Sequence, residues 1–315
     1  MSKHLIVGAG PVGTATAARL VATGHEVTAV TRSGGGPEVA GVRRVALDAG
    51  DATALAQLAE GCVAIYNCAN PSYHRWVTDW PPIATALLEA AKSSGAVLAT
   101  VSNLYGYGPV DGPMTEELPL RATTTKGRVR AEMWRQALAA HDAGQAAVVE
   151  VRGSDYFGPT LTSQSALGER VCPRILEGKS VSVLGNPDVA HTFTYVPDVA
   201  ELLVRAAADP TSWGRAWHVP SAPPCTQREA VAALAAAASV PAPSVRALPH
   251  LVLKTVGLFS PQVRELEEVR YQFTAPFVMD SSAATAHFSC APTPFPEACA
   301  TTIAWWRSEA AQRAA

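Results

Sequence analysis

The sequence lacks the features that mark several large classes of protein. Its 25 basic and 27 acidic residues nearly balance and form no run of like charge, which argues against a nucleic-acid partner. It has no apolar stretch long enough to span a membrane, no signal-peptide pattern, and no C-x-x-C pair or metal-ligand spacing among its six cysteines. These absences predict a cytoplasmic globular protein without a metal site or a membrane anchor.

Short apolar runs alternate with helix-forming segments along the first half of the 315-residue chain. The expected strands are His4–Val7, Glu26–Thr31, Val42–Leu47, Val63–Asn67, Val97–Val101 and Ala147–Val151. The expected helices are Thr14–Ala22, Ala52–Ala59, Pro82–Lys92 and Gly127–Ala140. Strands separated by helices in this way predict βαβ units, and therefore an α/β fold with a parallel sheet.

A glycine-rich turn follows the first expected strand and opens the first helix. It reads Gly8-Ala9-Gly10-Pro11-Val12-Gly13. In such a turn Gly8 permits the tight bend, Gly10 lets a pyrophosphate approach the backbone, and Gly13 lets the helix pack on the strand. The N-terminus of the helix, with Pro11 and Val12, offers N–H groups to phosphates. The position of the motif predicts a Rossmann, doubly wound, dinucleotide-binding domain.

The end of the second strand indicates which dinucleotide is bound. A site that prefers NAD places Asp or Glu about 20 residues after the glycines, against the ribose 2′-hydroxyl. Here the strand ends in Arg32 and Ser33 with no carboxylate. A guanidinium and a hydroxyl suit a 2′-phosphate, so NADP(H) is predicted as the cofactor, with NAD left as the alternative.

Six segments, in this order, resemble motifs of the extended short-chain dehydrogenases/reductases, also called the NAD-dependent epimerase/dehydratase family. They are residues 47–51, 66–70, 102–106, 113–120, 152–159 and 191–200. The resemblance implies that Asp48 contacts the adenine, and that the turn with Cys68, Ala69 and Asn70 contacts the nicotinamide-side ribose. It also implies an NADP-binding Rossmann domain of residues 1–160 with returning segments at about 191–220. A smaller C-terminal substrate domain would come mainly from 161–190 and 221–315.

The catalytic pattern of the family is missing. Its members carry Tyr-x-x-x-Lys on the helix after the fifth strand, where the Lys lowers the Tyr pKa so that the Tyr can transfer a proton near neutral pH. None of the five lysines here has a Tyr four positions before it. Alignment on the helix puts Thr124 at the Tyr position and Arg128 at the Lys position. We therefore expect Arg128 to bind the cofactor.

Other residues near strand ends could supply the proton transfer. Ser102 lies at the end of the fifth strand, although an ungapped alignment puts Val101 at the family's Ser/Thr position. Tyr105 lies in the loop after that strand, and Lys126 lies at the start of the next helix. Ser102, Tyr105 and Lys126 are the predicted catalytic residues. Packing roles for the tyrosine and a solvated helix start for the lysine are the structural alternatives.

His191 stands where nucleotide-sugar enzymes of the family often carry a phosphate-binding Arg. This difference argues against a nucleotide sugar and for another small-molecule substrate; a homodimer is compatible with the sequence. The leading prediction is an NADP(H)-dependent oxidoreductase acting on a carbonyl or alcohol with an atypical proton donor. The alternatives are an epimerase/dehydratase-type isomerase or lyase with tightly bound NAD(P), or a non-catalytic NADP(H)-sensing regulatory protein.

Overall fold

The computed structural model describes residues 1–36 and 38–314 of the protein. The chain divides into two compact units, and each is interleaved in sequence. The first unit comprises Met1–Gly108, Glu116–Gly153 and Val199–Val219. The second comprises Pro109–Thr115, Ser154–Asp198 and Pro220–Ala315.

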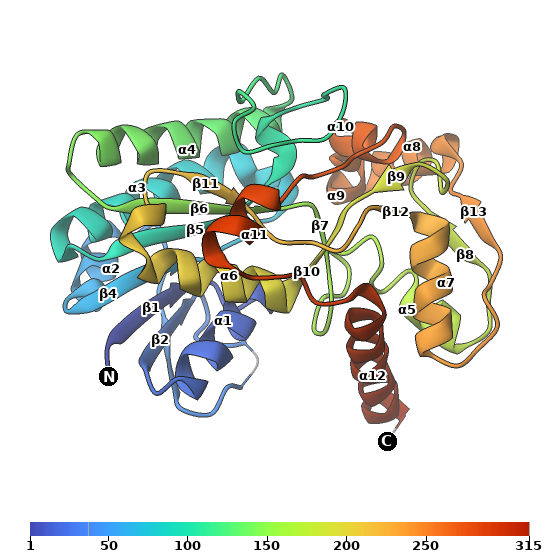
Figure 1. The fold of residues 1–315 in the computed structure, drawn as a ribbon, viewed down its shortest axis with the longest axis horizontal. Coiled ribbons are helices and arrows are strands. Elements are labelled where there is room, and N and C mark those ends of the chain that lie inside the picture. The colour runs from blue at the N-terminus through green and yellow to red at the C-terminus, as the bar shows by residue number, and fades with distance from the viewer. Residues whose placement is uncertain (37, 315) are drawn as a thin grey trace. The chain divides into compact units, whose positions relative to one another are not determined.

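The first unit is built on a seven-stranded sheet in the order β11-β6-β5-β4-β1-β2-β3 (Figure 1). All six neighbouring pairs in this sheet are parallel. The strands are β1 (Lys3–Val7), β2 (Glu26–Thr31), β3 (Val42–Ala46), β4 (Cys62–Asn67), β5 (Val97–Asn103), β6 (Val148–Gly153) and β11 (Ala216–His218). The predicted α/β Rossmann fold is confirmed.

Helices cover both faces of this sheet. α2 (Ala52–Ala59), α3 (Trp76–Ser94) and α4 (Thr125–Asp142) pack in succession, α2 against α3 and α3 against α4. α1 (Pro11–Ala22) and the part of α6 (Val196–Ala208) that belongs to this unit are joined by an ion pair between Arg19 and Glu201. α1 buries Gly13, Thr16, Ala17 and Leu20, a helical spacing that turns one face of the helix to the sheet.

α3 begins at Trp76, six residues before the predicted start at Pro82. Proline is typical of a first helical turn, but here Pro81 and Pro82 lie inside the helix. The side chains of Trp76 and Trp80 are 1% and 0% exposed. Their burial, one helical turn apart, stabilises an N-terminal extension that propensity alone does not indicate.

The strand order reverses between β1 and β4. From β1 the chain proceeds through β2 to β3 on one side, and from β4 through β5 and β6 to β11 on the other. Loops that follow β1 and β4 therefore lead in opposite directions at the carboxyl edge of the sheet. In open parallel sheets this is the place where ligands bind.

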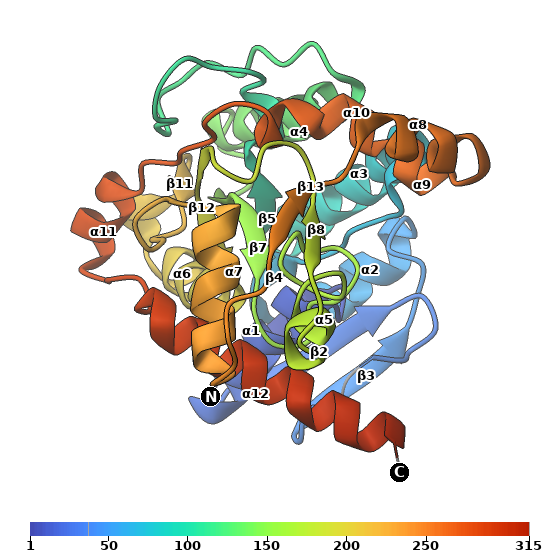
Figure 2. The same ribbon diagram turned by 90° about the vertical axis from the view of Figure 1, so that its right-hand side faces the viewer.

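The second unit has its own apolar core. Its strand pairs are β7 (Asp155–Phe157) with β10 (Phe193–Tyr195), β8 (Val181–Val183) with β13 (Val245–Ala247), and β9 (Ala190–His191) with β12 (Cys225–Thr226). Its helices are α5 (Cys172–Leu176), α7 (Gln227–Ala237), α8 (His250–Phe259), α9 (Pro261–Arg264), α10 (Leu266–Val269), α11 (Ser282–Phe288) and α12 (Phe295–Ala314). Figure 2 shows β8 beside β13.

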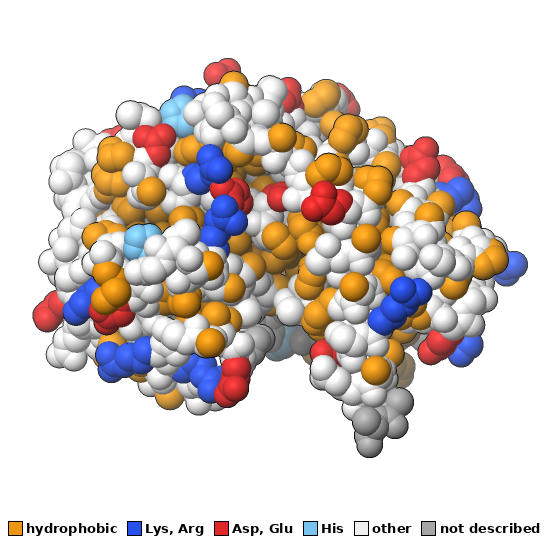
Figure 3. Space-filling view, turned by 60° about the horizontal axis from the view of Figure 1, so that its bottom comes forward, with side chains coloured by type: hydrophobic (Ala, Val, Ile, Leu, Met, Phe, Trp, Pro, Cys, Tyr) orange, Lys and Arg blue, Asp and Glu red, His pale blue; other side chains and the backbone are white. Residues whose placement is uncertain are grey.

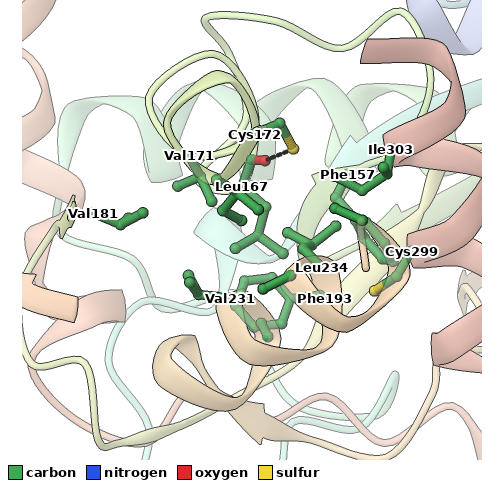
Figure 4. Packing of buried hydrophobic residues seen from close by; sticks show 14 of the residues in the cluster. Phe157, Leu167, Val171, Cys172, Val181, Phe193, Val231, Leu234, Cys299 and Ile303 are labelled. Atoms are coloured by element: carbon green, nitrogen blue, oxygen red, sulfur yellow. Dashed lines mark hydrogen bonds between the residues drawn. The ribbon is translucent and has the colours of Figure 1, made fainter. Parts of the chain in front are cut away.

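Figure 4 shows side chains of α5, α7 and α12 meeting those of the short strands in this core. Phe157 and Phe193 lie among Leu234 and Ile303, and all four side chains are buried. The Cys172 thiol donates to the carbonyl oxygen of Leu167 at 3.1 Å. Because the members of this cluster all belong to the second unit, that unit packs around a core of its own.

Charged side chains of both signs lie among apolar and neutral ones on the face shown in Figure 3. Among residues 1–36 and 38–314, no helix is long and apolar enough to cross a membrane.

Candidate functional site

The glycine turn is shaped by two close backbone contacts. Gly8 has a φ of +101°, and a Cβ there would lie 2.5 Å from the carbonyl oxygen of Cys68. A Cβ on Gly13 would lie 1.9 Å from the carbonyl oxygen of Gly8. Both positions therefore exclude any side chain, because backbone atoms cannot move aside.

Gly10 differs from these two glycines. Apart from Gly10 itself and the chain next to it, no described atom lies within 4 Å of the position that a Cβ on Gly10 would take. Gly10 is also the N-cap of α1, Pro11 begins the helix, and no described side chain caps this end. The first-turn N–H groups near Val12 thus border open space at the positive end of the helix, which fits the pyrophosphate of a dinucleotide.

The loop after β2 lies against the glycine turn. A Cβ on Gly36 would lie 3.0 Å from the Cβ of Ala9. The Thr31 hydroxyl donates to the carbonyl oxygen of Gly35 at 2.8 Å, and Arg44 donates to that of Gly36 at 3.0 Å. Arg32 and Ser33 at the start of this loop are exposed. A cation and a hydroxyl thus lie close in sequence to a loop that contacts the candidate phosphate turn.

The turns after β3 and β4 complete this half of the site. The exposed Asp48 carboxylate accepts the backbone N–H of Gly50 at 2.9 Å. After β4, the Cys68 N–H donates to Val7 at 2.8 Å, which holds the Cys68–Asn70 turn against β1 and the glycine turn. Burial raises the pKa of the Cys68 thiol to about 12. The thiol is therefore uncharged at neutral pH and packs in the turn without acting as a nucleophile.

The other half of the site lies where β5 meets α4. Ser102, Tyr105 and Lys126, the predicted catalytic residues, are 2%, 8% and 1% exposed. The Tyr105 hydroxyl is 2.7 Å from the hydroxyl of Tyr73, and the Lys126 ammonium lies 5.5 Å from the centre of the Tyr73 ring. Tyr73 therefore links Tyr105 to Lys126.

Sequence reasoning did not select Tyr73. It lies in the 3₁₀ turn Tyr73–Arg75, which follows β4 by a few residues and leads into α3. Its sequence position shortly after β4 could have indicated it. Because β4 and β5 are neighbours in a parallel sheet, residues shortly after both strands lie at the same edge of the sheet. No motif contains Tyr73, Tyr105 and Lys126 together, because they come from three separate segments.

Thr124 and Arg128, the residues at the family's Tyr and Lys positions, have different surroundings. Thr124 is the N-cap of α4, and its hydroxyl accepts the Gly127 N–H at 3.2 Å. The Arg128 guanidinium is exposed and donates to the carbonyl oxygen of Thr123 at 2.7 Å. The structure thus brings Lys126, and not Arg128, beside a tyrosine.

A second polar cluster surrounds Tyr107, and its other members were not selected by sequence reasoning. Arg152 donates to the Glu150 carboxylate at 2.6 Å and to the Tyr107 hydroxyl at 2.7 Å, and that hydroxyl is 2.8 Å from Nε2 of His218. The backbone N–H of His218 donates to Glu116 at 3.0 Å. Burial raises the pKa of Tyr107 despite the nearby Arg152, so Tyr107 is best explained as part of a buried, paired network that joins β6, β11 and the β5 loop.

In the second unit, His191 is 1% exposed and its Nε2 forms a short hydrogen bond with the Asp155 carboxylate. Its ring stacks on Phe273 and Phe277, with centroids 5.3 and 5.4 Å away. A histidine enclosed in this way has a partner and a packing role already.

Comparison with known proteins gives a family and a set of similar folds. The sequence model of the NAD dependent epimerase/dehydratase family matches residues 4–219. No curated protein matches the sequence closely enough to count as a relative. The chain resembles dTDP-glucose 4,6-dehydratase from Bacillus anthracis in complex with NAD, with a TM-score of 0.80 and 17% identity over 98% of this chain and 97% of that one.

Two epimerases are similar to the chain to the same degree. UDP-glucose 4-epimerase from Thermotoga maritima gives a TM-score of 0.79 at 14% identity, over 98% of this chain and 99% of that one. UDP-glucuronic acid 4-epimerase from Bacillus cereus in complex with NAD gives 0.78 at 16% identity, over the same shares of both chains. At these identities the likeness shows the shared fold.

The prediction against a nucleotide-sugar substrate is contradicted by these similarities, since the enzymes with this fold are named for dTDP-glucose, UDP-glucose and UDP-glucuronic acid. That prediction depended on His191 standing in for a phosphate-binding Arg. In the structure His191 is sequestered between phenylalanine rings and bonded to Asp155. The identity of this buried residue therefore gives no ground for excluding a nucleotide.

Proposed function

Because the chain belongs to the NAD dependent epimerase/dehydratase family, we propose that it is an NADP(H)-dependent oxidoreductase acting on a carbonyl or alcohol group of a small molecule. The observation that carries this proposal is the combination of an open Gly10 position with Arg32 directly after β2. The first accommodates a pyrophosphate, and the second supplies positive charge where NAD-preferring sites have a carboxylate. The family and the similar structures are enzymes, which disfavours a purely regulatory role.

The first unit would be the cofactor-binding domain, and the second would be the substrate domain. The residues proposed to contact the dinucleotide are Gly8, Gly10, Pro11, Val12, Gly13, Arg32, Ser33, Asp48, Cys68, Ala69, Asn70 and Arg128. When bound, the dinucleotide supplies or accepts a hydride at its nicotinamide ring. Tyr105 and Lys126 would take part in the transfer of the proton that accompanies the hydride, and Ser102 would orient the substrate oxygen.

A second candidate function is favoured by the similar structures. These are dehydratases and epimerases, several of them with NAD bound. An enzyme of that type would keep its cofactor and return it to its starting oxidation state in each cycle. Nucleotide sugars therefore belong in the substrate screen for this protein.

Fluorescence titration of the purified protein with NADPH and with NADH tests the proposed cofactor. We expect tighter binding of NADPH, and equal affinities would overturn the NADP(H) preference. A screen of carbonyl compounds and nucleotide sugars then separates the two functions. Net consumption of added NADPH supports the oxidoreductase, whereas turnover of substrate without net cofactor consumption supports the epimerase/dehydratase type.

A further inference from the structure

We propose that Tyr73 is the catalytic residue that exchanges a proton with the substrate oxygen, with Tyr105 as its hydrogen-bond partner and Lys126 as the cation beside it. This inference rests on the proposed function, because it assigns the proton-transfer step of that reaction. It assigns the role to a residue outside the helix where the family's Tyr-x-x-x-Lys lies.

The place of Tyr73 in the fold supports this role. The Cys68–Asn70 turn lies against Gly8 of the candidate phosphate turn, and Tyr73 follows it by three residues. Trp76 fixes the 3₁₀ turn by donating its indole N–H to the carbonyl oxygen of Pro71 at 2.9 Å. The ring of Tyr73 packs edge-on against that of Trp76, with centroids 5.0 Å apart. The phenol is therefore held near the proposed nicotinamide-side turn.

The contacts of Tyr73 favour its ionised form as an intermediate. The hydroxyls of Tyr73 and Tyr105 are 2.7 Å apart, so Tyr105 can donate a hydrogen bond to a Tyr73 phenolate. The Lys126 ammonium, on a side chain that is 1% exposed, lies 5.5 Å from the Tyr73 ring centre. Solvent screens a buried charge weakly, and a nearby positive charge stabilises a phenolate. Lys126 and Tyr105 together do for Tyr73 what the family's Lys does for its Tyr.

Exposure distinguishes Tyr73 from its hydrogen-bond partner Tyr105. Tyr105 is 8% exposed, whereas Tyr73 is only partly buried and offers its hydroxyl to a ligand more readily. Burial raises the pKa of four other phenols, Tyr66, Tyr107, Tyr195 and Tyr271, which makes them poor acids near neutral pH. Within the hydrogen-bonded pair, Tyr73 is thus the outer member and Tyr105 the inner one.

In the reductive direction the carbonyl carbon gains the hydride and the carbonyl oxygen gains the Tyr73 proton, which yields an alcohol. The phenolate left on Tyr73 accepts the Tyr105 hydrogen bond and takes a proton from water before the next cycle. The oxidative direction reverses each transfer.

A pH titration of the cofactor-free protein, followed by the ultraviolet absorbance of tyrosinate, tests the proposal without a substrate. We expect the first phenol to ionise below the ordinary tyrosine pKa of about 10. Tyr73→Phe should remove this first step, and Lys126→Met should move it to higher pH. The matched control, Tyr156→Phe, should leave it in place. A first step that persists in Tyr73→Phe, or its absence from the wild type, overturns the proposal.

Kinetics with a substrate from the screen give a second readout. Tyr73→Phe should lower kcat by about a hundredfold or more while NADPH affinity stays within about twofold, because only the proton donor is removed. Unchanged turnover in Tyr73→Phe contradicts the assignment even if NADPH binds. Failure of the wild type to bind NADPH would instead contradict the proposed function, and the tyrosinate titration would still decide on Tyr73. Circular dichroism of each Phe variant verifies that it is folded.

Discussion

The glycine turn and the junction of β5 with α4 lie at the same edge of one sheet but are encoded in different ways. At the glycine turn three positions close in sequence set the geometry, since Gly8 and Gly13 permit backbone contacts and Gly10 faces open space. At the β5–α4 junction the side chains that meet are Tyr73, Tyr105 and Lys126, from three segments. The backbone shape of the glycine turn can be predicted from a short sequence motif. The side-chain cluster can be recognised only in the folded structure, which brings its three segments together.

The largest effect that this comparison predicts is on folding. Gly13→Ala should lower the free energy of unfolding by about 3 kcal/mol, because its Cβ would collide with the Gly8 carbonyl oxygen. Urea unfolding of the two variants, with Gly10→Ala as the matched control, measures the difference. Gly10→Ala should have a free energy of unfolding close to that of the wild type. If Gly10→Ala and Gly13→Ala lose the same free energy of unfolding, the space beside Gly10 is not open.

The second effect is on the cofactor alone. Gly10→Val should abolish NADPH binding and leave the thermal unfolding temperature near that of the wild type, because its side chain would enter the space assigned to the pyrophosphate. Fluorescence titration and a thermal melt of the same sample give both quantities. If the folded variant binds NADPH as well as the wild type does, the turn is structural only.

The third effect separates the residues at the β5–α4 junction. Lys126→Ala should reduce turnover about a hundredfold and Tyr105→Phe about tenfold, since each removes support for a phenolate. Thr124→Ala should change turnover little and lower the free energy of unfolding by about 1 kcal/mol, because it removes the N-cap of α4. Single-turnover rates and urea unfolding measure both. A complete loss of turnover in Thr124→Ala alone would show that this hydroxyl has inherited the role of the family's tyrosine.

The smallest effect concerns cofactor choice. Arg32→Ala should weaken NADPH binding about tenfold and leave NADH binding unchanged, because only NADPH carries the 2′-phosphate that the guanidinium would contact. Titration of both cofactors with both proteins gives the ratio, and Arg44→Ala, which alters the neighbouring arginine bonded to Gly36, serves as the comparison. If Arg32→Ala weakens NADH binding as much as NADPH binding, Arg32 does not contact the 2′-phosphate.

The sequence was most informative where periodicity and glycine determine the backbone. The strands from β1 to β6 and their parallel order follow from apolar runs and short connections, and they are observed within a few residues of the predicted bounds. The start of α3 was misplaced because proline usually signals a first turn, whereas burial of Trp76 and Trp80 extends this helix in the N-terminal direction.

Sequence reasoning selected part of the cluster that we propose to be catalytic. Ser102, Tyr105 and Lys126 were selected because they lie near a strand end or a helix start. Alignment with the family's helix indicated Thr124 and Arg128 instead. Alignment compares positions along a helix and cannot show that Lys126 is buried beside a residue from another loop. His191 misled for the same reason, since its pairing with Asp155 is visible only in three dimensions.

A crystal structure of the protein with NADP⁺ bound tests the central claim most directly. We predict that the pyrophosphate lies over Gly10, that the 2′-phosphate lies against Arg32 and Ser33, and that the Tyr73 hydroxyl is the phenol nearest to C4 of the nicotinamide. A nicotinamide whose C4 lies nearest to Thr124, with Tyr73 turned away and the 2′-phosphate distant from Arg32, would contradict this prediction.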